Sequence, residues 1–279
     1  KRGRVRGEAL PSIGSVSRMT ISSKKQDQDN SWALKVEGGD KSAIFPASLA
    51  KGTKIEVRDL FFATPARLKF LKTENSEKQY ALDVIKKIAI ANPAVGFKVI
   101  VDSVQKLNLT QSELPERINK IVGDDFSANS VAINFEREEI TISGYAGIPT
   151  YNRRTSEDQY VYVNGRPVKD KVLQGAIKAA YADFLGGGRF PVLVLFINIP
   201  SEEVDVNVHP AKSEVRFRDQ RAITGAIITA LREAIGQVGH KASTTVAEFA
   251  MNRLATGSAS SSYKQSYYAP YTAAYSAPK

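Results

Sequence analysis

The sequence has 279 residues, more than the usual single domain of about 100 to 200, so we expect two domains. It contains no cysteine, which excludes disulfide bonds, thiolate chemistry and cysteine-ligated zinc. Only His209 and His240 could offer ring nitrogens to a metal, so we expect no metal centre of this kind. The net charge of +10 favours a polyanionic partner such as nucleic acid or nucleotide phosphates.

The sequence carries no membrane signal. No apolar run approaches the roughly 20 residues that span a bilayer, and the opening stretch KRGRVRGEAL lacks the apolar segment of a secretory signal. We therefore expect a soluble, intracellular protein with no membrane partner.

The first predicted element is a helix that begins near Ala9 or Leu10, because Pro11 fits only in a first helical turn. Its apolar side chains are spaced i, i+3 and i+6: Leu10, Ile13 and Val16. The preceding Gly7 could let backbone N–H groups approach a phosphate at the helix start. A basic leader before an ordinary amphipathic helix explains the segment equally well.

Residues 53–62 and 97–102 are predicted strands, separated by two predicted helices. Thr53 follows a glycine at the mouth of the first strand, where its hydroxyl could donate to a phosphate or a ring nitrogen, although turn chemistry explains it as well. Pro65 begins the short first helix. Ser76 and Gln79 form a capping box ahead of the second, whose predicted inward side chains are Leu82, Ile85 and Ile88.

A break is predicted near residues 103–113, followed by a helix over 114–123 with Pro115 in its first turn and Gly123 as its stop. Further strands are predicted at 139–147, 159–168, 191–199 and within 204–217, and helices at 170–185 and 222–236. The inward side chains predicted for the helix 170–185 are Val172, Ile177, Ala180 and Phe184. This mixed order predicts an α/β or α+β protein with a domain boundary near residue 110.

The segment VDVNVHPAKSEVRF alternates apolar and polar residues from Val204, then places Lys212 two residues after Pro210. Proline cannot continue a strand ladder, so the lysine is predicted in a short, pinned turn. There its ammonium could serve as a point charge for a γ-phosphate. The alternative is a solvated turn lysine beside a locally hydrogen-bonded His209.

A cluster of cations follows the strong turn signal Asn164-Gly165. We call it the basic patch, and it consists of Arg166, Lys169, Lys171 and Lys178. Such a patch could lie on DNA phosphates, but a generic charged surface is an equally good interpretation. No aromatic residues are interleaved with it, so stacking on single strands is not indicated.

Four segments, in this order and at corresponding separations, resemble the amino-terminal region of the MutL family of DNA mismatch repair ATPases: RGEALPSIGSVSRMTISSK, GTKIEVRDLFFATPARLKFLK, YVYVNGRPVKDK and EVDVNVHPAKSEVRF. The family belongs to the GHKL group, with type II topoisomerases and heat-shock chaperone ATPases. The resemblance implies an α+β fold: part of a GHKL (Bergerat-type) ATPase domain in residues 1–110, a ribosomal-protein-type transducer domain in 111–240, and a disordered linker in 241–279.

The resemblance also implies roles for individual residues. A phosphate-binding lid would consist of Arg6, Gly7, Glu8, Ala9 and Leu10, while Thr53 would belong to the last motif of the ATP pocket. Asn207 and Lys212 would reach the pocket from the second domain, with Lys212 on the γ-phosphate. The basic patch corresponds to a segment linked to DNA binding.

The resemblance implies an ATP-gated, DNA-associated matchmaker that couples mismatch recognition to downstream repair, with ATP and Mg²⁺ as cofactors. The implied partners are DNA, a mismatch-recognition protein and a repair nuclease or helicase. A homodimer when full length and a cytoplasmic location at the bacterial nucleoid are also implied.

One departure from the family concerns catalysis. The family's ATPase domain begins about 90 residues earlier, with a helix that carries a general-base glutamate and a magnesium-ligating asparagine, and then an adenine-binding motif. We find none of these in this sequence, so we expect a truncated region that does not hydrolyse ATP alone. ATP turnover above that of a Lys212→Ala control would contradict this expectation.

Two other functions fit parts of the sequence. One is a non-enzymatic nucleic-acid-binding module that acts through the basic patch in residues 166–178. The other is a topoisomerase subunit, which is disfavoured because no active-site tyrosine domain is found and the four motifs fit MutL better.

Overall fold

The computed structural model describes residues 8–205 and 215–255, with backbone alone for 238–255. Contacts divide the chain between Ile85 and Lys86 into two compact units, each described separately below. Within the described residues no helix is long and apolar enough to cross a membrane.

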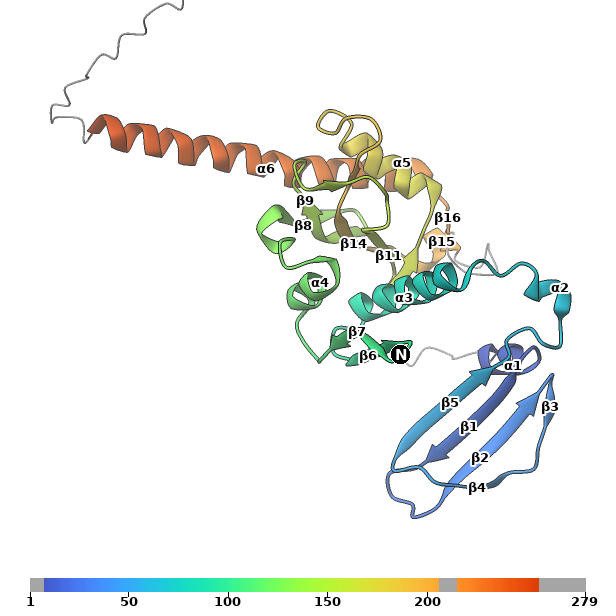
Figure 1. Ribbon diagram of the computed structural model, residues 1–279. Helices are drawn as coiled ribbons and strands as arrows, with labels where there is room; N and C mark the ends of the chain where they lie inside the picture. The colour runs from blue at the N-terminus through green and yellow to red at the C-terminus, as the bar shows by residue number, and fades with distance from the viewer. Residues whose placement is uncertain (1–7, 206–214, 256–279) are drawn as a thin grey trace, which may run out of the picture. The chain divides into compact units, whose positions relative to one another are not determined.

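The first unit is a five-stranded antiparallel sheet with short helices (Figure 1). Its strands are β1 (Arg18–Lys24), β2 (Ser31–Glu37), β3 (Asp40–Lys41), β4 (Phe45–Ala47) and β5 (Gly52–Arg58), in the order β3-β2-β1-β5 with β4 also paired to β2. Helix α1 (Ala9–Gly14) precedes β1, and α2 (Pro65–Leu68) follows β5. The helix starts predicted near Ala9 and at Pro65 are therefore confirmed.

Helix α1 packs closely on the sheet at Gly14. A Cβ at this position would lie 2.9 Å from Met19 Cε and 2.9 Å from Val36 Cγ1, and all three residues are buried. Gly14 thus permits a contact that a larger residue could make only by displacing its neighbours.

Strand β5 ends four residues before its predicted end, and the backbone explains the difference. Asp59 and Phe61 have φ angles of +51° and +70°, in the left-handed region, which cannot continue a strand. The turn is held by the Phe61 N–H, which donates to Val16 O at 2.7 Å, and by an ion pair of 2.6 Å between Arg18 and Asp59.

The helix predicted after α2 is α3 (Glu74–Ala91), but the capping box assigned to Ser76 and Gln79 is wrong. Thr73 precedes the helix, and its hydroxyl accepts a long, 3.4 Å bond from the Ser76 N–H. The helix therefore starts two residues before Ser76, because a hydroxyl was available earlier in the chain. The predicted inward set is also only partly right, since Ala89 and Ile90 are fully buried and Ile88 is 42% exposed.

The second unit contains a mixed five-stranded sheet in the order β12-β11-β14-β9-β8. Its strands are β8 (Ser130–Arg137), β9 (Ile140–Gly147), β11 (Gln159–Val163), β12 (Arg166–Val168) and β14 (Leu193–Asn198). Strands β11 and β14 are parallel, and the other neighbours are antiparallel. Alternate residues of β14 face opposite sides, which gives the sheet two cores.

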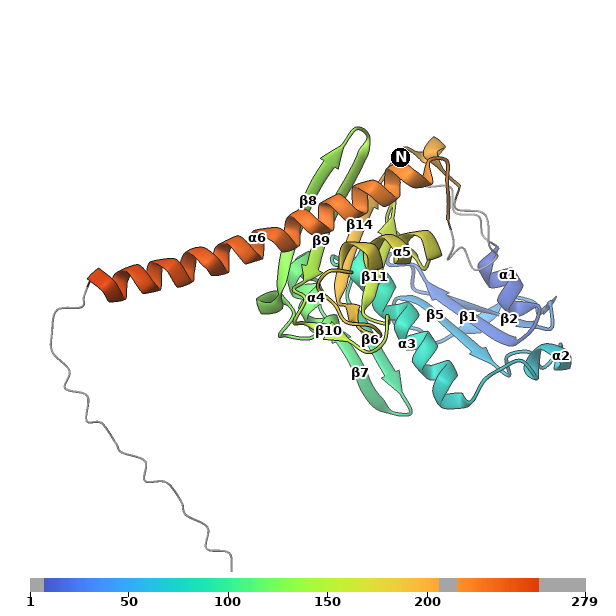
Figure 2. The same cartoon turned by 90° about the horizontal axis from the view of Figure 1, so that it is seen from above.

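One face of this sheet is covered by α5 (Lys171–Ala180) and α6 (Gln220–Ala255), which pack against each other (Figure 2). The other face is covered by the end of α3 and by α4 (Leu114–Val122). Both cores are apolar, so the sheet is buried on both sides, which explains the nearly continuous apolar sequence of β14.

Shorter elements complete this unit: β6 (Phe97–Val101), β7 (Val104–Leu109), η1 (Ser127–Asn129), β10 (Asn152–Arg153), β13 (Phe190–Pro191), η2 (Ser201–Glu203), β15 (Val204–Asp205) and β16 (Arg216–Phe217). The break predicted over 103–113 is wrong, because β7 pairs with β6 through a tight turn. Asp102 and Ser103 form that turn with φ of +50° and +65°, a conformation for which Asn-Gly is the usual signal.

Predicted helix ends were less accurate than helix starts. Helix α4 begins and stops as predicted, with Pro115 in its first turn and Gly123 at φ +136°. Helix α5 ends at Ala180 rather than at residue 185, and Phe184 is half exposed instead of inward. Helix α6 continues to Ala255, past the predicted end at residue 236.

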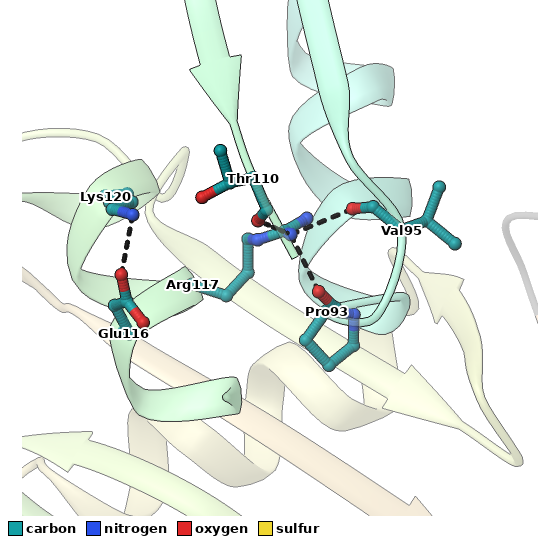
Figure 3. A network of polar contacts seen from close by, with 6 residues as sticks. All are labelled: Pro93, Val95, Thr110, Glu116, Arg117 and Lys120. Atoms are coloured by element: carbon teal, nitrogen blue, oxygen red, sulfur yellow. Dashed lines mark hydrogen bonds and ion pairs between the residues drawn. The ribbon is translucent and has the colours of Figure 1, made fainter. Parts of the chain in front are cut away.

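Arg117 is the largest fully buried side chain described (Figure 3). Its Nη2 donates to three carbonyl oxygens, those of Pro93 (2.8 Å), Val95 (2.9 Å) and Thr110 (2.7 Å), and its Nη1 donates to Ala89 O at 3.1 Å. One guanidinium therefore joins α4 to the end of α3 and to the chain around the β6–β7 hairpin.

Candidate functional site

The described part of the predicted lid lies at the start of α1. Glu8 precedes the helix, and its carbonyl oxygen accepts from the Ser12 N–H at 3.2 Å and from the Ser12 hydroxyl at 2.7 Å. Its carboxylate makes no capping bond, and Ala9 and Leu10 are exposed. The side chains of these three residues are therefore accessible within their unit.

Thr53 lies on β5, directly opposite Ser23 of β1. The two hydroxyl oxygens are 3.1 Å apart, and either one could donate to the other. Whichever donates, one hydroxyl hydrogen of the pair remains for another acceptor. The exposed pair can thus donate one hydrogen bond to a ligand.

The described lid residues and Thr53 do not form one cluster. Helix α1 adjoins the start of β1 at Arg18, whereas Thr53 pairs near its end at Ser23. Five residues of strand separate these positions, a distance of about 17 Å along the strand. Figure 1 shows α1 at one end of the sheet and the beginning of β5 at the other.

The basic patch in the second unit is built on a rigid backbone. Asn164 and Gly165 form the tight turn between β11 and β12, with φ of +48° and +76°. The Asn164 amide donates to Ile199 O at 2.9 Å and accepts from the Ile199 N–H at 3.0 Å. This clamp fixes the chain just before Arg166.

A helix cap fixes the other end of the same segment. The Asp170 carboxylate accepts from the N–H groups of Val172 (2.8 Å) and Leu173 (3.2 Å), which starts α5. Lys171 is consequently the first residue of the helix, where the positive end of the helix dipole disfavours a cation. A bound anion at this position would relieve that repulsion.

All four basic-patch side chains are exposed, and none forms an ion pair with another side chain in the described parts of the chain. Lys171 and Lys178 lie two turns apart on α5, so they point from the same side of the helix. The patch therefore presents uncompensated positive charge on a fixed backbone, which suits contact with phosphates.

The far side of α5 is anchored in the core. Tyr181, at the end of the helix, is buried, and its hydroxyl donates to Gly147 O at 2.7 Å. Burial raises the pKa of this hydroxyl. No group of three or more His, Asp or Glu side chains that could hold a metal occurs in residues 8–205 and 215–237.

Comparisons with known proteins agree on one family. Residues 118–236 match the family model "DNA mismatch repair protein, C-terminal domain". The DNA mismatch repair protein MutL of Rhodospirillum rubrum is 52% identical over 255 residues, which cover 89% of this chain and 40% of that protein. This chain belongs to the MutL family.

Solved structures of a MutL ATPase domain and of another DNA repair protein share the fold. The Aquifex aeolicus MutL ATPase domain complexed with ADP is 27% identical, with a TM-score of 0.58, and the match covers 79% of this chain and 76% of that one. The amino-terminal domain of a DNA repair protein matches with a TM-score of 0.70 and 25% identity, over 83% of this chain and 75% of that one. The predicted α+β GHKL-type fold is confirmed. The chain spans about 40% of the length of the curated MutL relatives it matches.

Several predicted site residues of this MutL chain lie outside the described residues: Arg6, Gly7, Asn207 and Lys212, together with His209 and Pro210. The proposed lysine contact to the γ-phosphate therefore stays a prediction. The structure adds the residues that hold the patch in place. Asp170 could have been found from its position before a helix, but the pairing of Asn164 with Ile199 leaves no local sequence signal.

Proposed function

We propose that this chain acts in DNA mismatch repair as the nucleotide-binding and DNA-associated part of a MutL-type matchmaker. The 52% identity to a curated MutL protein over most of the chain carries this proposal. The basic patch supports it physically, because four exposed cations on a fixed backbone favour a DNA phosphate track. The alternative function, a non-enzymatic nucleic-acid-binding module that acts through the basic patch, is less favoured, since the structures similar to this chain include an ATPase domain bound to ADP.

The nucleotide is ATP with Mg²⁺, and its contacts come from one stretch of the chain and three single residues: Arg6–Leu10, Thr53, Asn207 and Lys212. Lys212 distinguishes the triphosphate from the diphosphate by its contact to the γ-phosphate. Loss of that contact after hydrolysis would switch the protein between two states. The further partners are a mismatch-recognition protein, a repair nuclease or helicase, and a second copy of the full-length chain, in the cytoplasm at the nucleoid.

The DNA-binding part is tested by charge reversal at matched positions. Lys169→Glu with Lys171→Glu alters the patch, while Lys98→Glu with Lys106→Glu makes the same change of net charge on the exposed β6–β7 hairpin. Fluorescence anisotropy over a range of salt concentrations measures duplex affinity. We expect the patch variant to reduce the salt slope by about 2 and the hairpin variant to leave it unchanged. Equal slopes for the two variants would refute the patch assignment.

The nucleotide part is tested by calorimetric titration with ADP and with a non-hydrolysable ATP analogue. Lys212→Ala is expected to weaken the analogue by about 10- to 100-fold, the loss of one charged hydrogen bond, and to leave ADP binding nearly unchanged. Lys98→Ala serves as the control on an exposed lysine. If Lys212→Ala weakens both nucleotides equally, this residue does not contact the γ-phosphate.

A further inference from the structure

A pocket of about 520 Å³ opens in the second unit beside the second half of α5. Its walls come from that helix, from the loop Leu185–Arg189 that follows it, and from the Phe190–Pro191 strand β13. This volume lies within the range of small-molecule sites, about 300 to 1,000 Å³. None of the roles assigned above uses this pocket as a whole, although Lys178 lies on its rim.

Glycines form part of the pocket wall. Gly175 lies in the interior of α5, where glycine weakens a helix relative to alanine. A Cβ at Gly175 would meet no described atom within 4 Å, and its φ does not require glycine. The same is true of Gly186 and Gly187 in the loop. Neither close packing nor a positive φ requires glycine at these three positions, and all three line the pocket.

The pocket is positively charged. Lys178 and Arg189 both line it, while no Asp or Glu does. Both cations are exposed, and neither forms an ion pair with another described side chain. Three acids lie next to lining residues in the sequence, and none of them lines the pocket: Glu157, Asp158 and Asp183. Asp158 lies 3.2 Å from Arg153, and Asp183 lies 3.1 Å from Arg232. The site therefore suits an anion.

The pocket also has an apolar side, formed by Leu185 and the partly exposed Phe190. A ligand that satisfies both sides joins an anionic group to a body that packs on apolar side chains, and a nucleotide with its phosphate and flat base is such a ligand. Lys178 belongs to the pocket and to the basic patch, so a strand held on the patch would reach the opening.

We propose that this pocket receives one nucleotide of an unpaired DNA strand, with the phosphate between Lys178 and Arg189 and the base against Leu185 and Phe190. This inference rests on the proposed DNA association. It adds a preference for single-stranded over double-stranded DNA, because a base paired inside a duplex cannot enter the pocket. Phe190 lies twelve residues beyond Lys178 in the sequence, and the fold brings the two together.

Two variants change the pocket and two serve as matched controls. Gly175→Leu fills the space without altering charge, and Gly236→Leu makes the same change at an exposed glycine of α6 whose Cβ also meets nothing within 4 Å. Arg189→Gln removes one cation, and Arg221→Gln removes an exposed cation outside the pocket. The probes are labelled oligothymidine of about 12 nucleotides and a duplex of equal length.

We expect both pocket variants to weaken single-strand binding by about fivefold or more, with duplex affinity and both controls unchanged. Single-strand affinity at the wild-type level in both pocket variants would overturn the proposal. So would equal losses for single strand and duplex, since the pocket would then contribute only general charge.

Small ligands separate this inference from the proposed function. Thymidine 5′-monophosphate is expected to bind the intact chain and to lose affinity in Gly175→Leu, while deoxyribose 5-phosphate binds more weakly because it lacks the base. Equal affinities for thymidine 5′-monophosphate and deoxyribose 5-phosphate would contradict the assignment of the pocket to a nucleotide. A polyglutamate peptide that displaces the labelled oligothymidine as effectively as the monophosphate does would also contradict it. If the chain binds no DNA but binds the monophosphate in this manner, the proposed DNA association fails and the pocket is a mononucleotide site.

Discussion

Replacing Arg117 with methionine tests whether the buried guanidinium holds the second unit together. Methionine keeps an apolar stem of similar length but donates nothing, so four carbonyl oxygens, those of Ala89, Pro93, Val95 and Thr110, lose this partner. The single Nη2 faces three of them with only two hydrogens, so at least one bond is shared.

The expected loss follows from these bonds. Burial lowers the pKa of the Arg117 guanidinium, because the charged form loses contact with water in this site. Removing it relieves that desolvation cost but leaves the carbonyls of Val95 and Thr110 without a donor, at about 1 to 3 kcal/mol each where water cannot reach them. Pro93 O keeps a bond from the Ser112 N–H at 3.1 Å, and Ala89 O keeps one from the Asn92 N–H at 3.3 Å. The net loss in the free energy of unfolding should be about 2 to 4 kcal/mol, which is the cost of two unpaired carbonyls less the relieved desolvation of the guanidinium.

Urea unfolding followed by circular dichroism measures this loss. With a slope of about 2 kcal/mol per molar urea, the midpoint of the second unit should fall by roughly 1 to 2 M. Lys120→Met is the control on the same helix, since it breaks only the partly exposed Glu116–Lys120 pair visible in Figure 3, worth about 0.5 kcal/mol or less. A loss below about 1 kcal/mol in Arg117→Met would refute the reasoning, because the carbonyls would then be satisfied without the guanidinium.

Three further changes have defined outcomes. Burial raises the pKa of Tyr162 and of Tyr181, so above about pH 10 the unfolded chain binds fewer protons and stability falls by up to about 1.4 kcal/mol per pH unit for each tyrosine. Urea unfolding at a series of pH values above about 10 measures this fall in the free energy of unfolding. If Tyr162→Phe loses stability with pH as steeply as the wild type, the prediction is contradicted. Asp170→Ala removes the cap of α5 and should lower the free energy of unfolding by about 1 kcal/mol, whereas Asp170→Asn should keep most of the capping energy. Thermal unfolding of the two variants measures the difference, and equal losses would contradict the prediction. Gly144→Ala places a Cβ 2.0 Å from Val194 O at φ +129°, and a loss of less than about 2 kcal/mol would show that the strands shift easily.

Features of the fold that depend on neighbours in the sequence were predictable. Pro115 and Gly123 mark the two ends of α4 because proline suits a first turn and glycine tolerates the left-handed region. The Asn164-Gly165 turn follows from the same backbone preferences. In each case the residue that carries the signal is the residue that adopts the conformation.

Features that depend on tertiary contacts were not predictable in this way. Arg117 reads as a surface cation on an amphipathic helix, and only the convergence of four carbonyls from other segments explains its burial. The turn at Asp102 and Ser103 adopts a conformation that its residue types do not announce, so the hairpin was missed. The start of α3 two residues before Ser76 was missed because Thr73 and Ser76 both carry a hydroxyl that suits a helix cap.

One candidate site could be predicted from neighbouring residues in the sequence, and the other depends on tertiary contacts. The exposure of Lys169 and Lys171 follows from charge and turn position alone. The pocket does not, since the absence of interleaved aromatics indicated no base stacking near the patch. Phe190 pairs with Arg153 across β13 and β10, and it lines the same pocket as Lys178 although no local pattern indicates this.

Strand β12 ends the second sheet with three residues, and the middle one is Pro167. An additional strand could pair with only three residues at this edge, and one of them, Pro167, has no amide hydrogen to donate. Self-association of this unit by edge-to-edge ladder growth is thereby discouraged at β12. Any second copy that docks on this side has to do so through side chains.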